Sequence, residues 1–154
     1  MWLGADLLYL GELDRLLGRS WFTSFVYTPE ELATAESFGP ARAREFLAGR
    51  FAAKEAVLKV LGTGMAGGVR PCQVAVLRED DGAPAVRLTG AAAARAATLD
   101  LHEISVTITH KRDLVLAVAL GLPEAYREAM AGREGGTGEP VNTGHEPRRC
   151  QSVD

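Results

Sequence analysis

The sequence predicts an α+β fold in which a small antiparallel sheet packs on a long central helix. Residues 41–61 predict the helix, because they are rich in strong helix formers and contain no Pro and one internal Gly. Apolar side chains cover most of its circumference, which is typical of a helix packed on several sides. Alternating or continuous apolar runs predict strands at 72–78, 85–89, 103–109 and 114–122.

The N-terminal segments predict a strand followed by a short helix. Residues 2–8 are apolar apart from Asp6, which on local evidence alone marks a strand end or a cap. Leucines fall on one face of residues 10–17 and predict a short helix that ends at Gly18. The aromatic side chains of residues 20–26 predict a segment anchored on the core.

A second helix has a clear start. Thr28 is a favourable N-cap, and Pro29 follows at the first helical position. Glu31, three residues after the Thr, completes a capping box. We expect this helix to run to about Ser37, where a Gly-Pro pair follows.

Turn residues predict the connections in the second half. Residues 65–71 form a glycine-rich loop, and 79–84 contain an Asp-Gly pair, which favours a hairpin between two strands. The alanine-rich residues 90–99 predict a helix. The polar residues 110–113 predict the turn that joins the last two strands.

The composition changes from residue 123 onward to Gly, Glu, Arg and Pro without apolar periodicity. We therefore expect one domain at 1–122 and a C-terminal tail at 123–154 that is largely disordered, with a helical extension at 126–133. A chain of 154 residues is about the common size of a single domain.

Composition also excludes several classes of protein. The net charge is −3, so no general basic field is available for nucleic acid. The two cysteines, Cys72 and Cys150, lie too far apart for a metal motif and predict unpaired thiols in a reducing compartment. No apolar run is long enough to span a membrane, and the first residues lack a basic signal region. We expect a cytoplasmic protein with no nucleic-acid or membrane partner.

Glu55 and Lys59 are the first candidate functional residues. They lie one turn apart on one side of the central helix, on a face otherwise made of Ala48, Ala52 and Ala56. A solvated salt bridge between them is the simplest interpretation. The small neighbours and the Gly-Thr-Gly turn that follows favour a second one, in which a ligand approaches the face and a glycine turn binds an anion.

The segment FLAGRFAAKEAVLKVLGTG resembles the signature of the holo-acyl-carrier-protein synthase family, the small 4′-phosphopantetheinyl transferases. Its hallmark is an aromatic residue, two further residues, Lys-Glu-Ala, a Lys four residues beyond the Glu, and Gly-Thr-Gly. These elements stand at Phe51, Lys54, Glu55, Ala56, Lys59 and Gly62–Gly64. The resemblance covers residues 1 to about 122 and implies a 4′-phosphopantetheinyl transferase-like fold.

The resemblance also implies the reaction: Mg²⁺-dependent transfer of 4′-phosphopantetheine from coenzyme A to a serine of apo-acyl carrier protein, with release of adenosine 3′,5′-bisphosphate. In the family an opening Gly-x-Asp supplies a metal-binding carboxylate, so Asp6 and Glu55 are expected to bind Mg²⁺. With Lys59 they form the expected catalytic group. The serine proton goes to Glu55 or to a metal-bound water, and fatty-acid and polyketide carriers are both possible partners.

The coenzyme is expected to contact Lys59, the turn residues Gly62, Thr63 and Gly64, and His110. A lone His at a strand end is usually a surface residue, but the family has a Thr-x-x-His at this place, and Thr107 stands three residues before His110. The backbone N–H groups of the turn and the His ring are expected to reach the coenzyme phosphates.

Two further expectations concern partners. The small family members are homotrimers with sites between subunits, and Arg50 and Lys54, charged within an apolar arc, are candidates for such an interface. Relatives carry a basic residue where this chain has Glu12, so Arg15 and Arg19 are expected to contact the acidic carrier instead. The alternative function is a coenzyme A-binding or carrier-binding module with little transferase activity.

Overall fold

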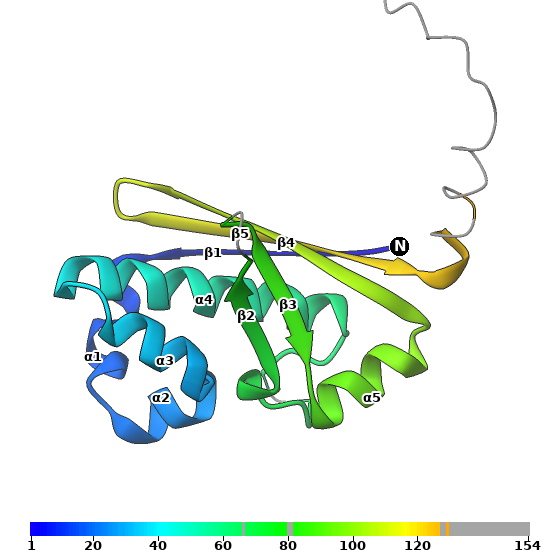
Figure 1. Cartoon of the computed structure of the whole chain (residues 1–154), viewed down its shortest axis with the longest axis horizontal. Coiled ribbons are helices and arrows are strands. Elements are labelled where there is room, and N and C mark those ends of the chain that lie inside the picture. The colour runs from blue at the N-terminus through cyan, green and yellow to red at the C-terminus, as the bar shows by residue number, and fades with distance from the viewer. Residues whose placement is uncertain (66, 80–81, 127–128, 130–154) are drawn as a thin grey trace, which may run out of the picture.

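A 21-residue helix, α4 (Pro40–Val60), runs through the centre of the fold. The computed structural model describes residues 1–65, 67–79, 82–126 and 129. Before α4 come β1 (Trp2–Tyr9), η1 (Leu10–Leu13), α1 (Asp14–Leu17), α2 (Ser20–Val26) and α3 (Pro29–Glu36). After it come η2 (Pro71–Gln73), β2 (Val74–Arg78), β3 (Pro84–Leu88), α5 (Gly90–Thr98), β4 (Leu101–Lys111) and β5 (Leu114–Pro123). Figure 1 shows α4 beneath a sheet that is seen edge-on.

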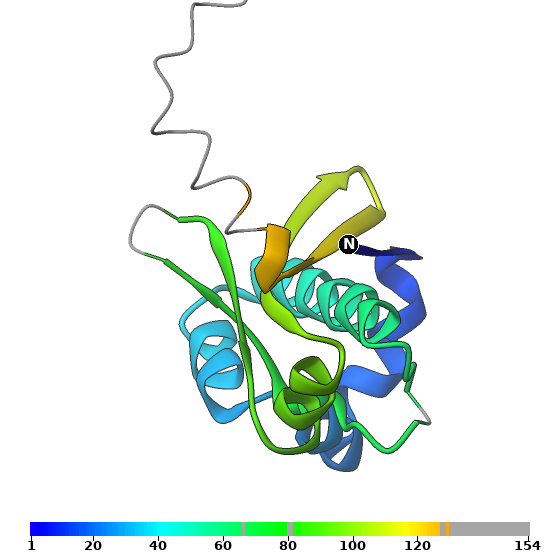
Figure 2. The same ribbon diagram turned by 90° about the vertical axis from the view of Figure 1, so that its right-hand side faces the viewer.

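The main sheet has three antiparallel strands in the order β1-β5-β4. Its central strand, β5, alternates in burial along its length. Val115, Ala117 and Ala119 are fully buried on the face toward α4. A separate two-stranded hairpin, β2–β3, packs on another side of the helix, as Figure 2 shows. The predicted α+β class, with a small antiparallel sheet on a long central helix, is confirmed.

Small residues let β1 approach α4 closely. A Cβ placed on Gly4 would lie 2.1 Å from the carbonyl oxygen of Ala56, a distance that no side chain can occupy. Ala48, Ala52 and Ala56 are all fully buried in the core. The expectation that these alanines leave an open face for a ligand is therefore wrong: they make room for strands of the protein itself.

The helical layer opposite the sheet contains α1, α2 and α3 (Figure 1). The capping box at Thr28 is confirmed: the Thr28 N–H donates to Glu31 Oε2 at 2.8 Å, and its hydroxyl accepts from the Glu31 N–H at 3.3 Å. Residues 20–26 form a helix in their own right. The last turn is shorter than predicted, because β4 continues through His110 and Lys111.

A buried ion pair joins α3 to α4. Lys54 is 1% exposed, and its Nζ lies 2.8 Å from Oε2 of the fully buried Glu31. The same ammonium donates to the carbonyl oxygens of Pro71 and Val74, while the other oxygen of Glu31 accepts from the Val76 N–H. Burial lowers the pKa of Lys54, and the charge of Glu31 opposes that shift. The expectation that Lys54 lies at a subunit interface is wrong, because its charge is satisfied inside the chain.

The C-terminal region is described only in part. β5 ends at Pro123, close to the predicted domain boundary, and Glu124–Tyr126 begin a helical turn. The predicted tail beyond them, apart from residue 129, lies outside the described residues, as does most of the helix expected at 126–133. In the part of the chain that the structure describes, no helix combines the length and the apolar character needed to cross a bilayer.

Candidate active site

Asp6 and Lys59 meet where β1 crosses the C-terminal half of α4. Along β1 the residues facing α4 are Gly4, Asp6 and Leu8, so Asp6 is directed inward and its side chain is only 17% exposed. The Lys59 ammonium donates to Asp6 Oδ1 at 2.8 Å and to the Ala5 carbonyl oxygen at 2.7 Å. The ion pair of Lys59 is thus made with β1, rather than one turn back along its own helix.

Glu55 completes this group from one turn earlier on α4. Its pKa is raised, first by partial burial and second by the negative charge of Asp6, while the charge of Lys59 acts in the opposite direction. The two carboxylates therefore lie within electrostatic reach of each other and of one ammonium. The sequence prediction grouped Asp6 with Glu55 and Lys59, although Asp6 precedes Lys59 by 53 positions.

The donor set suits a hard divalent cation. Carboxylate oxygens are the ligands that Mg²⁺ prefers, and proteins commonly supply only one or two of them while phosphates and water fill the other positions. Among the described residues no cluster of three or more His, Cys, Asp or Glu side chains forms a metal site. Two neighbouring carboxylates, Asp6 and Glu55, are the donors that this part of the structure offers to such a cation.

The glycine turn after α4 does not offer free N–H groups. The N–H of Gly62 donates to the Lys59 carbonyl at 3.1 Å, and those of Thr63 and Gly64 donate to the Leu58 carbonyl at 3.1 and 3.3 Å. These bonds cap the end of the helix, as left-handed glycine turns commonly do. The expectation that the three N–H groups are available to a phosphate is therefore wrong.

Arg95 also holds this turn, a role that was not predicted from the sequence. Its Nε donates to the Leu61 carbonyl oxygen at 2.9 Å, so α5 supports the residue that caps the C-terminal end of α4. An Arg in an alanine-rich helix is ordinarily a solvated residue, and the contact is made across 34 positions of sequence. Only the tertiary structure reveals it.

His110 lies on the opposite edge of the sheet from Asp6. It belongs to β4, whereas Asp6 belongs to β1, and β5 stands between them. Within one chain the structure thus separates His110 from the two carboxylates. The ring lies instead on the other flank of α4, with Nε2 3.3 Å from the Glu45 carbonyl oxygen.

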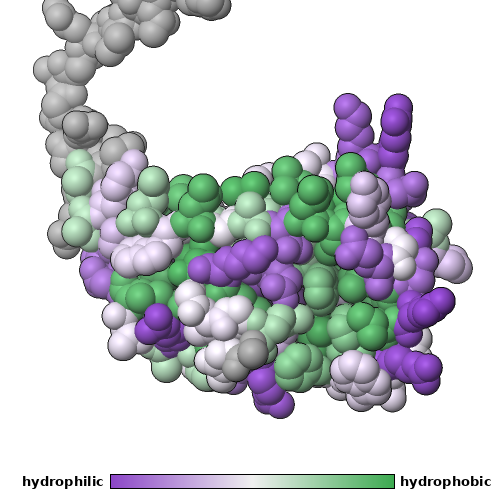
Figure 3. All heavy atoms as spheres, turned by 180° about the vertical axis from the view of Figure 1, so that it is seen from behind, coloured by the Kyte–Doolittle hydropathy of each residue, from purple (hydrophilic) through white to green (hydrophobic). Residues whose placement is uncertain are grey.

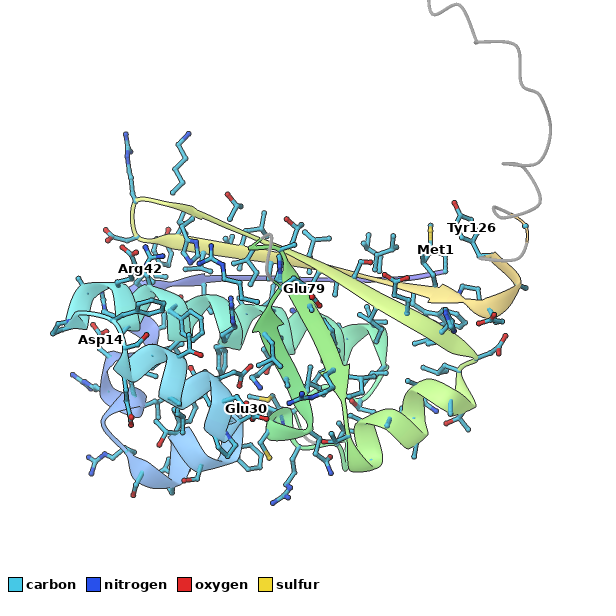
Figure 4. The ribbon with its side chains drawn as sticks, viewed as in Figure 1. Met1, Asp14, Glu30, Arg42, Glu79 and Tyr126 are labelled. Atoms are coloured by element: carbon cyan, nitrogen blue, oxygen red, sulfur yellow. The ribbon has the colours of Figure 1, made fainter. Side chains whose placement is uncertain are left out.

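A cavity of about 300 Å³ opens beside His110. It lies between α4, the end of α3, the β2–β3 hairpin and β4. Its lining is basic and aromatic: Thr34, Phe38, Arg42, Glu45, Phe46, Arg50, Arg78, Gly82, Pro84, Ile108 and His110. Figure 4 labels Arg42 on the first turns of α4.

Two guanidinium groups in this cavity stack on aromatic rings. Arg42 lies 4.9 Å from the ring centre of Phe38, and Arg50 lies 4.3 Å from that of Phe46. The two rings contact each other edge-on with centres 5.5 Å apart. The cavity wall is therefore a continuous series of flat cationic and aromatic groups, a surface that suits a base or a phosphate.

Arg50 is the least satisfied polar group of the cavity. It is 8% exposed, and its Nε has no hydrogen-bond partner among the described residues. Burial lowers the pKa of Arg50. The sequence marked Arg50 as a charge in need of a partner, yet the interface it predicted for this residue is not visible in one chain. Arg42 and Arg78 were missed, although Phe38, Arg42, Phe46 and Arg50 recur every four residues.

Comparison with other proteins identifies the family of the chain. A family profile described as the 4′-phosphopantetheinyl transferase superfamily matches residues 3–119. The holo-[acyl-carrier-protein] synthase of Desulfovibrio desulfuricans is 37% identical over 120 residues, which are 77% of this chain and 94% of the relative. The protein of the same name from Methylobacterium sp. (strain 4-46) is 41% identical over 130 residues, 82% of this chain and 95% of the relative.

The solved structures that resemble this chain include enzymes of the same name. A complex of Chronobacterium ammoniagenes ACPS with CoA has a TM-score of 0.68 and 28% identity, covering 80% of this chain and 97% of that one. A holo-(acyl-carrier-protein) synthase from Bacillus anthracis in complex with CoA (3′,5′-ADP) has a TM-score of 0.67 and 27% identity, covering 80% and 96%. The chain therefore belongs to the 4′-phosphopantetheinyl transferase superfamily, and within it to the holo-[acyl-carrier-protein] synthase enzymes.

Proposed function

We propose that this enzyme transfers 4′-phosphopantetheine from coenzyme A to a serine hydroxyl of apo-acyl carrier protein, releasing adenosine 3′,5′-bisphosphate. The serine oxygen forms a bond to the phosphorus at the pantetheine end of the pyrophosphate, and the bond from that phosphorus to the bridging oxygen breaks. The observation that carries this proposal is the grouping of Asp6, Glu55 and Lys59 at the crossing of β1 and α4. The family and the coenzyme-bound relatives support it.

Each side chain of the group has a role suited to its charge. Lys59 is held by the Ala5 carbonyl and Asp6, and its ammonium would neutralise charge on a pyrophosphate bound beside them. Glu55 accepts the serine proton, since a carboxylate beside the attacking hydroxyl is a suitable general base. Asp6 and Glu55 would hold Mg²⁺, which supplies charge neutralisation on the phosphate oxygens when it is bound.

The basic cavity suits the nucleotide end of the coenzyme. Arg42 and His110 are placed for a phosphate, while the flat wall of Phe38, Phe46 and the stacked guanidinium of Arg50 suits a purine base. The unpaired Nε of Arg50 would gain a partner there. Gly62, Thr63 and Gly64 remain in the proposal as a wall beside the coenzyme, without phosphate bonds from their N–H groups.

We further propose a homotrimer in which two chains build each site. Asp6 and His110 lie on opposite edges of one sheet, so a single chain presents two separate half-sites. The β1 part of the sheet face turned away from α4 is apolar, with Leu3 68%, Leu7 61% and Tyr9 60% exposed. In Figure 3 hydrophobic residues gather along the side of the molecule that carries the sheet. Association through this face would bury it and bring half-sites of neighbouring chains together.

The carrier protein is proposed to dock at α1 and α2. Arg15 and Arg19 are exposed there, and Trp21 presents 64% of its surface beside them. Glu12, which stands where relatives are basic, has a structural role, because it accepts the Tyr9 N–H at 2.8 Å and caps the turn after β1. Positive charge next to an exposed aromatic side chain suits an acidic protein partner.

The direct test is the intact mass of an apo-acyl carrier protein after incubation with coenzyme A, Mg²⁺ and the enzyme. We expect a gain of one phosphopantetheine, and a rate that falls about 10²–10⁴-fold for Glu55→Gln because the proton acceptor is lost. Glu36→Gln removes an exposed carboxylate of α3 and should leave the rate unchanged. A fully active Glu55→Gln enzyme would contradict the role of Glu55.

The same experiment separates transfer from binding alone. A chain that binds coenzyme A in calorimetry but leaves every tested carrier at its original mass would be a binding module. That alternative is supported by Glu12, which stands where relatives carry a basic residue. It predicts that the mass of the carrier stays unchanged with the unmodified enzyme and with Glu55→Gln alike.

A further inference from the structure

Gly49 is an unexpected residue for the middle of α4. Glycine is among the least favourable residues in a helix interior, and this one lies well inside a helix of 21 residues. A Cβ placed there would lie 3.2 Å from Nε2 and 3.3 Å from Cε1 of His110, and 3.3 Å from Cγ2 of Ile108. The imidazole ring therefore rests directly on the backbone of α4 at the position where a side chain is missing.

This contact of the His110 ring with the backbone of α4, here called the seat, also determines which ring nitrogen is free. Nε2 lies 3.3 Å from the Glu45 carbonyl oxygen, and a carbonyl oxygen can only accept, so Nε2 carries the hydrogen. Nδ1 is then the nitrogen left for a ligand, and in the doubly protonated ring it can donate to a phosphate oxygen. In α-helical geometry the Glu45 carbonyl is the one that accepts from the N–H of residue 49. A side chain at position 49 would stand beside that carbonyl and displace the ring from it.

We propose that Gly49 is a positioning residue for His110: the absence of a side chain at this position lets the ring lie on α4, bond to the Glu45 carbonyl and present Nδ1 to the basic cavity. The inference rests on the proposed function, in which His110 contacts coenzyme A. It explains why a helix otherwise built from strong helix formers carries a glycine at this point, and it assigns Gly49 a role in coenzyme binding without contact to the coenzyme.

Gly49→Ala tests the proposal, because the added methyl group would press on the His110 ring at 3.2 Å, closer than side chains normally approach, while favouring the helix itself. We expect KM for coenzyme A to rise about tenfold, a loss of roughly one hydrogen bond to a charged group, with kcat within about twofold. Gly18→Ala is the matched control, since nothing lies within 4 Å of a Cβ placed there. An unchanged KM in Gly49→Ala would overturn the proposal.

A double-variant cycle separates positioning of His110 from a general packing effect. In a His110→Ala background the ring is absent, so Gly49→Ala should change KM no further. If Gly49→Ala also lowers the stability of the otherwise unmodified chain, the double variant should be no less stable than His110→Ala alone. Equal effects of Gly49→Ala in the presence and absence of His110, on KM or on stability, would contradict the inference.

A readout independent of turnover keeps this inference distinct from the proposed function. The ring ¹⁵N signals of His110, assigned by their loss in His110→Ala, should shift in Gly49→Ala and stay in place in Gly18→Ala. Shifted signals in an enzyme that transfers no phosphopantetheine would support the seat and refute the function. Unshifted signals in an active enzyme would refute the seat and leave the function standing.

Discussion

Lys59 is the positive charge that faces the two carboxylates of the candidate active site. Two carboxylates, Asp6 and Glu55, share its field, and only Asp6 is bonded to it directly. The raised pKa of Glu55 records the result: partial burial and the neighbouring carboxylate both disfavour its charged form. A divalent cation placed between the two acids would stabilise the charged form of Glu55. A carboxylate whose charged form is disfavoured without a cation is therefore suited to bind one at this position.

The pH dependence of stability should show this directly in metal-free protein. Because folding raises the pKa of Glu55 above its ordinary 4.5, its protonated form stabilises the fold below that value, and the benefit is lost as pH rises through the raised pKa. Glu55→Gln is neutral throughout. Its melting temperature relative to the unmodified chain should therefore rise as the pH increases above the ordinary pKa of Glu55.

We predict the sign of this change in melting temperature and no magnitude, because Glu55 is about half-buried and water screens its interactions. Thermal unfolding in the presence of a chelator at several pH values measures it. A difference between the two proteins that shrinks with rising pH would mean that Glu55 is stabilised as a carboxylate by some other group.

At the scale of single residues, the sequence predicted which charged residues lie near one another better than it predicted the hydrogen bonds that they form. The helical spacing placed Glu55 and Lys59 on one side of α4, and the opening Asp6 was matched to the family pattern. The partner of Lys59 could not be derived, because Asp6 is 53 positions away and the distance between β1 and α4 depends on Gly4. The seat of His110 on Gly49 is a tertiary contact of the same kind.

At the scale of elements, the Lys54–Glu31 pair fastens the start of α3 to the middle of α4 and to β2. Lys54 belongs to the signature run of the family, next to Glu55, yet its ammonium is fully enclosed and bonded to one carboxylate and two carbonyl groups. Its role is thus to hold the helix that carries Glu55. The two neighbouring charged residues of the signature thus have different surroundings: Lys54 is paired with Glu31 in the core, and Glu55 lies near Asp6 and Lys59.

Lys54→Ala should therefore destabilise the fold by about 3–5 kcal/mol, because it leaves Glu31 as a buried charge without its partner. Denaturant unfolding measures the loss. Lys111→Ala, at an exposed position of β4, is the matched control and should change stability little. A loss below about 1 kcal/mol for Lys54→Ala would show that the buried pair contributes little to holding α3 on α4.

Element starts and ends were predictable where the chemistry is local. The capping box of Thr28 and Glu31 was identified from sequence, but the same Glu31 also pairs with Lys54, which local chemistry cannot show. The alanines of α4 were assigned to a ligand face, because small residues permit close approach by a ligand and by a strand alike. Only the position of β1 decides between these two.

At the scale of the whole molecule, the sheet has one face in the core and one face without a partner in the described part of the chain. Across β1 and β5 the register pairs Leu3 with Leu120 and Leu7 with Leu116, so apolar side chains stand in adjacent rows on the outer face. This row and the separated half-sites favour the same conclusion, that the working enzyme is an assembly of several chains.

Leu7→Glu should break that assembly by placing a charge in the apolar row. Sedimentation velocity at micromolar concentration should show a trimer for the unmodified chain and a monomer for the variant, with transfer lost in parallel. Ala97→Glu, at an exposed position of α5, is the control and should leave both properties intact. A trimeric, active Leu7→Glu enzyme would remove the outer face of the sheet from the proposed interface.

The most direct test of the central claim is a crystal structure of the chain with coenzyme A and Mn²⁺ in place of Mg²⁺, in which anomalous scattering locates the ion. The account predicts one ion bonded to Asp6, Glu55 and the coenzyme pyrophosphate, with oxygen ligands at about 2.1 Å and Lys59 beside the same phosphates. An ion held elsewhere, or a pyrophosphate bound without contact to these two carboxylates, would contradict it.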